Sequence, residues 1–241
     1  MAQTFQERAT DPLQYDLGEV RWIDEGSEEH YTRRLIREAI GAHLGDLAGK
    51  RALDIGCGQG WLCAELARRG GQAVGIEPSA KNIQVARQRL PHIDFMHTSL
   101  EDYKPVWPFD VVTASMVFEH FGGLEGALEK VRSLTAPMGK FIILDGDFER
   151  FTSPRFGYSI ETQVLREGEV ATRTDYGERL GVLYDIFRTP ERFSEAALAS
   201  GWHNTDARPV SVPGWLMAEA PQYAVFEGKP LFQLFVLQNR P

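Results

Sequence analysis

Short apolar runs alternate with longer amphipathic stretches along most of the chain. Short apolar runs bounded by glycine and polar residues are typical of buried strands, whereas apolar residues spaced three and four apart indicate amphipathic helices. The pattern predicts strands at residues 53–55, 72–76, 93–97, 109–114 and 141–145. Helices are expected at 61–69, from Ser79 to about Leu90, and at 124–135. A last helix over 194–201 and a closing strand over 229–237 complete the alternation.

A loop of three glycines, Gly56, Gly58 and Gly60, directly follows the first predicted strand. Glycine lets the backbone turn sharply and approach a ligand, because no Cβ is in the way, so this loop predicts a bound group nearby. Its spacing is G-x-G-x-G, whereas a dinucleotide fingerprint is G-x-G-x-x-G. Asp54 precedes the glycines, where a carboxylate would repel a pyrophosphate but pair with an amino group. Both features argue against a nicotinamide-dependent dehydrogenase.

An acidic residue followed by G-x-G-x-G resembles the first motif of the class I S-adenosylmethionine-dependent methyltransferases. Further features follow in the order of that family: Glu77 ends the second strand, and 115–120 after the fourth strand resembles the fourth motif. The turn at 136–140 resembles the family's L-[KR]-P-G-G, from which Met138 departs. The resemblance covers residues 30–145 with ordered motifs. It implies an α/β, Rossmann-like, doubly wound sheet of seven mostly parallel strands with helices on both faces.

The absence of a linker between strand and helix signals favours one domain over residues 1–241. Within it the resemblance implies an N-terminal cap and helix over 1–48 and a cofactor-binding core over 49–145. An insertion that covers the substrate is expected over 146–189, followed by a C-terminal helix and strands over 190–241. Residues 181–188 alternate like a strand, but 151–174 show no clear period.

The resemblance also implies a site for S-adenosyl-L-methionine, whose product is S-adenosyl-L-homocysteine. The glycine-loop backbone and Asp54 are expected to face the amino acid portion, and Glu77 the ribose, since a carboxylate accepts two hydrogen bonds. Ser99, which replaces the family's usual aspartate, and Leu100 match the adenine-contacting positions. The candidate cofactor residues are Asp54, Gly56, Cys57, Gly58, Gly60, Glu77, Pro78, Ser99, Leu100, Ser115, Met116 and Tyr31. Tyr31 is interpreted either as a lid over the cofactor or as a packing residue of an amphipathic helix.

In methyl transfer to a hydroxyl group a base helps to remove the proton, and histidine is the natural candidate near neutral pH. His120 follows the fourth strand, close to where the transferred methyl group would lie in this fold. The alternative is a structural histidine that is hydrogen-bonded to backbone. Asp145 and Asp147 flank Gly146 and are interpreted as polar loop residues, so no metal site is predicted.

The segment 146–189 is rich in aromatic and arginine residues, which suit an acceptor with an apolar body and an acidic group. The candidate acceptor residues are Phe151, Arg155, Tyr158, Tyr184 and Arg188. For any single residue the alternative is that the aromatic ring anchors the insertion on the core, or that the arginine is solvated.

Charge and composition limit the partners. The net charge is −8 and the pI is about 5.3, and no basic cluster stands out, so we expect no nucleic acid substrate. The apolar runs are too short for a membrane span and the first residues lack an apolar signal core, so we expect a cytoplasmic protein without a membrane partner. Its two cysteines, Cys57 and Cys63, form neither a disulfide framework nor a metal spacing.

The sequence therefore predicts a methyltransferase that modifies oxygen, nitrogen or carbon of a small-molecule metabolite, as a monomer or homodimer. The alternative is a catalytically inactive, methyltransferase-like binding or regulatory protein. Turnover separates the two, because a binder would hold S-adenosylmethionine without forming S-adenosylhomocysteine.

Overall fold

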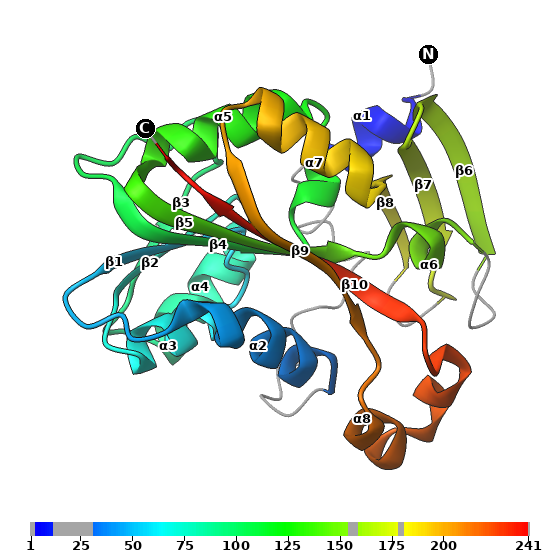
Figure 1. Ribbon diagram of the computed structural model, residues 1–241, viewed down its shortest axis with the longest axis horizontal. Helices are drawn as coiled ribbons and strands as arrows, with labels where there is room; N and C mark the ends of the chain where they lie inside the picture. The colour runs from blue at the N-terminus through cyan, green and yellow to red at the C-terminus, as the bar shows by residue number, and fades with distance from the viewer. Residues whose placement is uncertain (1–2, 12–30, 154–158, 178–180, 241) are drawn as a thin grey trace.

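The computed structural model describes residues 3–11, 31–153, 159–177 and 181–240 and shows a central sheet of seven strands (Figure 1). The strand order is β3-β2-β1-β4-β5-β10-β9. The parallel strands are β1 (Arg51–Ile55), β2 (Gln72–Glu77), β3 (Asp94–His97), β4 (Phe109–Ser115) and β5 (Thr135–Gly146). Strand β10 (Pro230–Gln238) runs antiparallel to β5, and β9 (His203–Ser211) runs antiparallel to β10. The predicted fold class is confirmed.

Helices cover both faces of this sheet (Figure 1). One face carries α2 (Tyr31–Leu44), α3 (Trp61–Arg68) and α4 (Ala80–Arg89), and the other carries α5 (Leu124–Leu134) and α7 (Pro190–Ala199). The alternation of side chains along β5 shows why both faces need cover: Ile142 and Leu144 are buried with α2, whereas Phe141 and Ile143 are buried with α5 and α7. Ser79 is the expected N-cap of α4, because its side chain accepts a hydrogen bond from the Asn82 amide.

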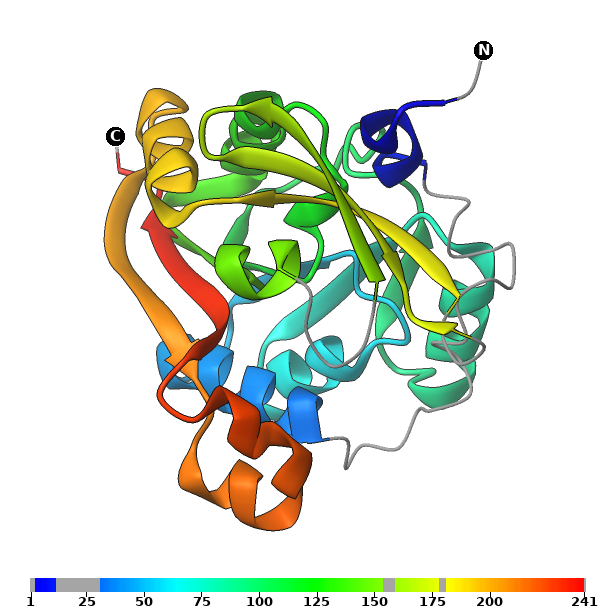
Figure 2. The same ribbon diagram turned by 90° about the vertical axis from the view of Figure 1, so that its right-hand side faces the viewer.

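A second, antiparallel sheet stands beside the carboxyl ends of the parallel strands (Figure 1, Figure 2). It consists of β6 (Ser159–Arg166), β7 (Glu169–Asp175) and β8 (Val182–Arg188) and lies within the segment expected to cover the acceptor. The strand predicted over 181–188 is confirmed as β8. The stretch without a clear period, 151–174, contains the end of α6 (Phe148–Thr152), all of β6 and all but the last residue of β7.

Short elements complete the chain. Helix α1 (Phe5–Ala9) packs on the second sheet, where the rings of Phe5 and Tyr184 meet edge to face with their centroids 5.7 Å apart. Helix α8 (Gly214–Glu219) and the 3-10 helix η4 (Pro221–Phe226) connect β9 to β10, and the 3-10 helix η2 (Phe118–His120) follows β4. Within the described part of the chain, no helix is both long enough and apolar enough to cross a membrane.

Candidate functional site

The glycine loop leaves β1 at the carboxyl edge of the sheet, and its three glycines all adopt left-handed backbone angles, with φ of 61° at Gly56, 51° at Gly58 and 85° at Gly60. A Cβ at Gly56 would lie 2.5 Å from Val117 Cγ2, and one at Gly60 would lie 2.6 Å from Phe95 Cζ. A Cβ at Gly58 would meet nothing within 4 Å. The protein thus needs Gly56 and Gly60 for its own packing, whereas Gly58 faces open space where a ligand can approach.

Glu77 closes this loop from the end of β2. Its Oε2 accepts a hydrogen bond from the Gly58 amide and its Oε1 accepts one from the Ser79 amide, each at 3.0 Å. Pro78 lies between these contacts and its carbonyl oxygen is 2.9 Å from His97 Nε2. The structure therefore brings together the glycine loop, Glu77 and Pro78, as a shared cofactor site requires.

Asp54 lies beneath the loop, in the interior. Its Oδ1 accepts a hydrogen bond from the Thr113 hydroxyl at 2.7 Å, and the Cys63 thiol approaches its Oδ2 at 3.7 Å. Burial raises the pKa of Asp54 to about 7. Cys57 and Cys63 are buried free thiols at the same place. The Asp54 carboxyl group thus links β1 to β4 and to α3 in the interior.

The adenine candidates follow β3. The Ser99 hydroxyl accepts a hydrogen bond from the Asp102 amide at 3.2 Å and donates one to Asp102 Oδ2 at 3.2 Å, so it caps a turn. The Leu100 side chain is buried in the hydrophobic cluster that also contains Ile76 and Ile55. These contacts hold the backbone beside Ser99 in place at the edge of the sheet.

Met116 follows β4 with a φ of 57°, which is uncommon for a residue other than glycine. Its amide donates a hydrogen bond to the Leu144 carbonyl at 2.8 Å, which holds the backbone in this conformation. Met116 and Tyr31, the first residue of α2, pack against the same hydrophobic cluster. Backbone strain that the surroundings maintain is frequent at ligand sites.

His120 ends η2 and faces the second sheet. Its Nδ1 lies 3.7 Å from Asp185 Oδ1 on β8, and its ring also hydrogen-bonds the backbone of Ala9 in α1. Burial, with a smaller contribution from the Arg188 charge, lowers the pKa of His120 to about 4, so the ring is neutral at pH 7. Burial and the charge of Glu119 raise the pKa of Asp185 to about 8. Both readings of His120, proton acceptor and backbone-bonded structural residue, have contacts here that suit them.

The interpretation of Asp145 as a polar loop residue is wrong, because it lies in β5 and is buried beside Glu119. Sequence reasoning did not identify Glu119 or Asp185. Glu119 Oε1 accepts a hydrogen bond from the Gly146 amide at 2.8 Å. Burial and the neighbouring Glu119 raise the pKa of Asp145 well above its ordinary value. The alternation in 181–188 does place Asp185 on the same face of its strand as Leu183 and Phe187, but nothing in the sequence indicates that this face meets η2.

The acceptor candidates lie in different surroundings. Phe151 of α6 stacks on Phe187 with ring centroids 4.9 Å apart. Tyr184 packs on α1, with the Arg8 guanidinium 4.7 Å from its ring centroid. Arg188 is buried, with its guanidinium bonded inside the protein. Arg155 and Tyr158 lie outside the described residues. Across the described ranges, no cluster of three histidine, cysteine or acidic side chains is arranged to hold a metal ion.

Comparison with known families decides which group of proteins shares this arrangement. A family described as a methyltransferase domain matches residues 28–208. The chain belongs to this methyltransferase family. The match includes the glycine loop, Glu77, η2 and the second sheet.

Curated relatives of this methyltransferase-family protein match less than half of the chain. The "Ubiquinone biosynthesis O-methyltransferase" of Rhodopseudomonas palustris (strain BisB5) is 38% identical over 104 residues, which are 42% of this chain and 41% of the relative. The protein of the same name from Bradyrhizobium sp. (strain ORS 278) is also 38% identical over 104 residues, with the same shares. The match therefore spans less than half of the length of these relatives.

Solved structures of methyltransferases share the fold over most of the chain. An S-adenosylmethionine-dependent methyltransferase from Mesorhizobium loti superposes with a TM-score of 0.69 at 21% identity, over 87% of this chain and 100% of that chain. The CcbJ methyltransferase from Streptomyces caelestis superposes with a TM-score of 0.64 at 15% identity, over 98% of this chain and 99% of that chain. The glycopeptide N-methyltransferase MtfA in complex with S-adenosylmethionine superposes with a TM-score of 0.62 at 15% identity, over 86% of this chain and 93% of that chain.

The residues of this methyltransferase-family protein fit S-adenosylmethionine, the cofactor that the sequence resemblance implies and that the MtfA structure contains. Gly58 leaves open space above the loop, and the Glu77 carboxylate lies directly beside it. A left-handed Met116 maintained by the Leu144 carbonyl stands at the end of the neighbouring strand. These features meet at the carboxyl edge of the sheet, where ligands bind in open α/β folds.

Proposed function

We propose that this protein transfers the methyl group of S-adenosylmethionine to an oxygen, nitrogen or carbon atom of a small-molecule acceptor. The observation that carries the proposal is the open space over Gly58 with the Glu77 carboxylate bonded to the same loop, in a chain of the methyltransferase family. The cofactor would supply an electrophilic methyl group.

The roles of the chain's own residues follow from their positions. We assign the ribose to Glu77, the amino acid portion to the backbone of 56–60 over Asp54, and the adenine to the turn at Ser99 and Leu100. Ser115, Met116 and Tyr31 would border the reacting end. Methyl transfer depends mainly on alignment and on the exclusion of water, which the adjacent second sheet can supply.

His120 is our candidate for the proton of a hydroxyl acceptor. Its ring is neutral at pH 7, because burial lowers its pKa, so it can take up a proton. The same low pKa makes it a weak base, and its bond to the Ala9 backbone also suits a structural role. These two observations favour the structural role of His120. The second candidate function is a protein that binds the cofactor without turnover.

Calorimetric titration with S-adenosylmethionine and S-adenosylhomocysteine tests the cofactor site first. Micromolar binding of both is expected, and no binding of either would refute the proposal. Release of S-adenosylhomocysteine is then measured with catechol and aniline as hydroxyl and amine probes, together with 4-hydroxybenzoate and 4-aminobenzoate as carboxylated counterparts. Product formation supports the enzyme, whereas binding without product from any probe supports the binding protein.

A further inference from the structure

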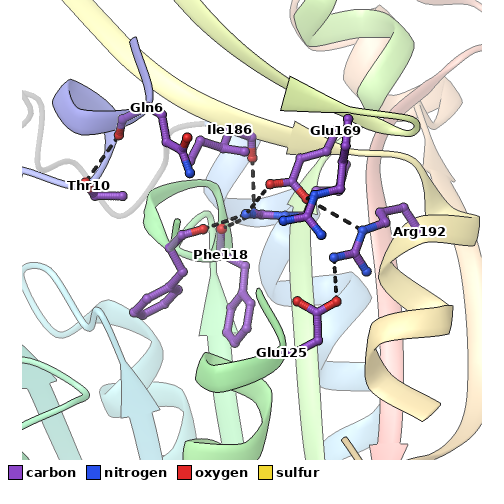
Figure 3. Close-up of polar contacts among 10 residues, drawn as sticks. Gln6, Thr10, Phe118, Glu125, Glu169, Ile186 and Arg192 are labelled. Atoms are coloured by element: carbon purple, nitrogen blue, oxygen red, sulfur yellow. Dashed lines mark hydrogen bonds and ion pairs between the residues drawn. The ribbon is translucent and has the colours of Figure 1, made fainter. Parts of the chain in front are cut away.

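The guanidinium group of Arg188 is buried at the junction between the two sheets. Its Nη1 donates a hydrogen bond to the Phe118 carbonyl at 2.7 Å, and its Nη2 donates one to the Phe121 carbonyl at 2.5 Å (Figure 3). Only 3% of the side chain is exposed. A planar fork with several donors can hold two carbonyl groups in a defined relative orientation, which a single point charge does less well.

An ion-pair network holds this arginine in turn. Glu169 on β7 lies 3.4 Å from Arg188 and 3.6 Å from Arg192 on α7, and Arg192 contacts Glu125 on α5 at 2.5 Å (Figure 3). The network therefore joins the second sheet to α5 and α7, two helices that cover the seven-stranded sheet. A charged group this deep is tolerated because it is paired and hydrogen-bonded.

The carbonyl groups that Arg188 holds flank η2, the segment just beyond the end of β4. Phe118 anchors this segment in the core, where its ring lies 5.5 Å from that of Phe141. His120 lies between the two bonded carbonyls, and Met116 precedes Phe118 by two positions. Fixing the backbone at 118 and 121 thus constrains the residues that we place next to the reacting end.

The position of Arg188 argues against a direct bond to an acidic acceptor. Arg188 lines a small cavity together with Glu119, Asp145 and Gln233, among others, and its Nε makes no hydrogen bond to any described residue. A carboxylate or phosphate that entered this cavity would lie against two buried carboxyl groups, and placing a further charge in this interior is unfavourable.

We propose that Arg188 is a positioning residue for methyl transfer. From the second sheet it fixes the backbone of 118–121 and thereby the placement of Met116 and His120, without touching cofactor or acceptor. This inference rests on the proposed function. It predicts a local effect on 116–122, which separates it from a general contribution of Arg188 to stability.

The test compares hydrogen exchange, measured by mass spectrometry, in the wild type, Arg188→Gln and Arg188→Lys. Arg173→Gln is the matched control, because Arg173 belongs to the same sheet but pairs with the exposed Glu161 at 2.8 Å. In Arg188→Gln we expect the peptide over 116–122 to exchange about tenfold faster or more, since a buried charge-assisted bond is lost. In Arg188→Gln the peptides of the glycine loop should exchange as in the wild type. In Arg173→Gln the peptide over 116–122 should also exchange as in the wild type.

Binding and turnover complete the test. The dissociation constant of S-adenosylmethionine should change less than about threefold in Arg188→Gln, while kcat with the probe that gives most product falls about tenfold or more. Arg188→Lys should be intermediate, and it decides the matter if Arg188→Gln does not fold. Wild-type exchange over 116–122 in a folded variant would overturn the inference. A failure of the proposed function is seen separately, as absence of S-adenosylmethionine binding in the wild type.

Discussion

At the scale of single residues, one carboxylate holds the glycine loop and is also our proposed partner for the ribose. Glu77 accepts hydrogen bonds from the amides of Gly58 and Ser79, so it holds the loop in shape before any ligand binds. A carboxylate prepared in this way needs little rearrangement to accept ribose hydroxyl groups, and preorganisation of this kind favours affinity.

Glu77→Gln should weaken S-adenosylmethionine binding by about 1.4 kcal/mol or more, a factor of about ten, because it removes the charge and one of two acceptors. The dissociation constant is measured by calorimetry, and circular dichroism confirms that the variant is folded. Glu161→Gln, on the exposed strand β6, is the matched control. Equal affinity in both variants would refute the ribose role of Glu77.

The glycines of the loop should separate into a ligand position and a packing position. Gly58→Ala places a methyl group in open space, so it should lower the free energy of unfolding by only about 1 kcal/mol, the cost of a left-handed backbone at alanine. The same methyl group should weaken cofactor binding, because it occupies the space that we assign to the ligand. Gly56→Ala must also displace Val117, which a Cβ would meet at 2.5 Å. We therefore expect a larger loss of unfolding free energy for Gly56→Ala, measured by urea denaturation; the reverse order would contradict this account of the loop.

At the scale of elements, the end of β5 depends on one side chain that links three segments. Asp147 accepts a hydrogen bond from the Arg150 amide as N-cap of α6, at 3.0 Å, and another from Gln233 Nε2 of β10, at 2.9 Å. The carboxylate thus ties α6, and with it Phe151 and its stacked partner Phe187, to the main sheet.

Asp147→Ala should lower the free energy of unfolding by about 2 kcal/mol, because it removes a helix cap and leaves the buried Gln233 amide without that acceptor. The control is Asp175→Ala, in which a single hydrogen bond to the Gly177 amide is lost at an exposed turn. Chemical denaturation of both variants measures the difference. Equal losses would show that the link between α6 and β10 adds nothing.

At the scale of the whole molecule, buried titratable groups make stability depend on pH. The pKa of Asp54 is raised by burial from its ordinary value of 3.8 to about 7. Between these values the unfolded chain loses the proton and the folded protein keeps it, so the free energy of unfolding falls as pH rises. The raised pKa of Asp185 acts in the same direction, and the lowered pKa of His120 acts in the opposite one.

Asp54→Asn should remove the contribution of Asp54 to the pH dependence of the free energy of unfolding, while it keeps an acceptor for the Thr113 hydroxyl. The unfolding free energy of the variant relative to the wild type should therefore rise between about pH 4 and pH 7, by up to about 1.4 kcal/mol per pH unit. Urea denaturation across this range measures the difference, in which the effects of Asp185 and His120 cancel. Asp94→Asn, on the surface of β3, is the exposed control. A difference that is constant with pH would show that Asp54 ionises normally in the folded protein.

The sequence by itself determined the elements from β1 to β4, the second half of β5 and the glycine loop, because these depend on patterns within a few residues. It predicted a turn at 136–140, whereas β5 already begins at Thr135 and Lys140 pairs with both β4 and β10. Gly56, Gly58 and Gly60 need left-handed angles, Ser79 caps the helix that begins beside it, and the short apolar runs become buried parallel strands. Strand β9 left no such signal: most of its residues are exposed, so it lacks the alternation that marks a half-buried strand.

Only the tertiary structure decided what the polar side chains do. His120 meets Asp185, and Arg188 reaches the carbonyls of 118 and 121, although these partners lie some 65 to 70 positions apart along the chain. Asp54 was expected to face a ligand, but its contacts with Thr113 and Cys63 place its carboxyl group in the interior. Burial and long-range contact set the pKa of a side chain and the partners it can bind, and local sequence carries no information on either until the sheets are packed.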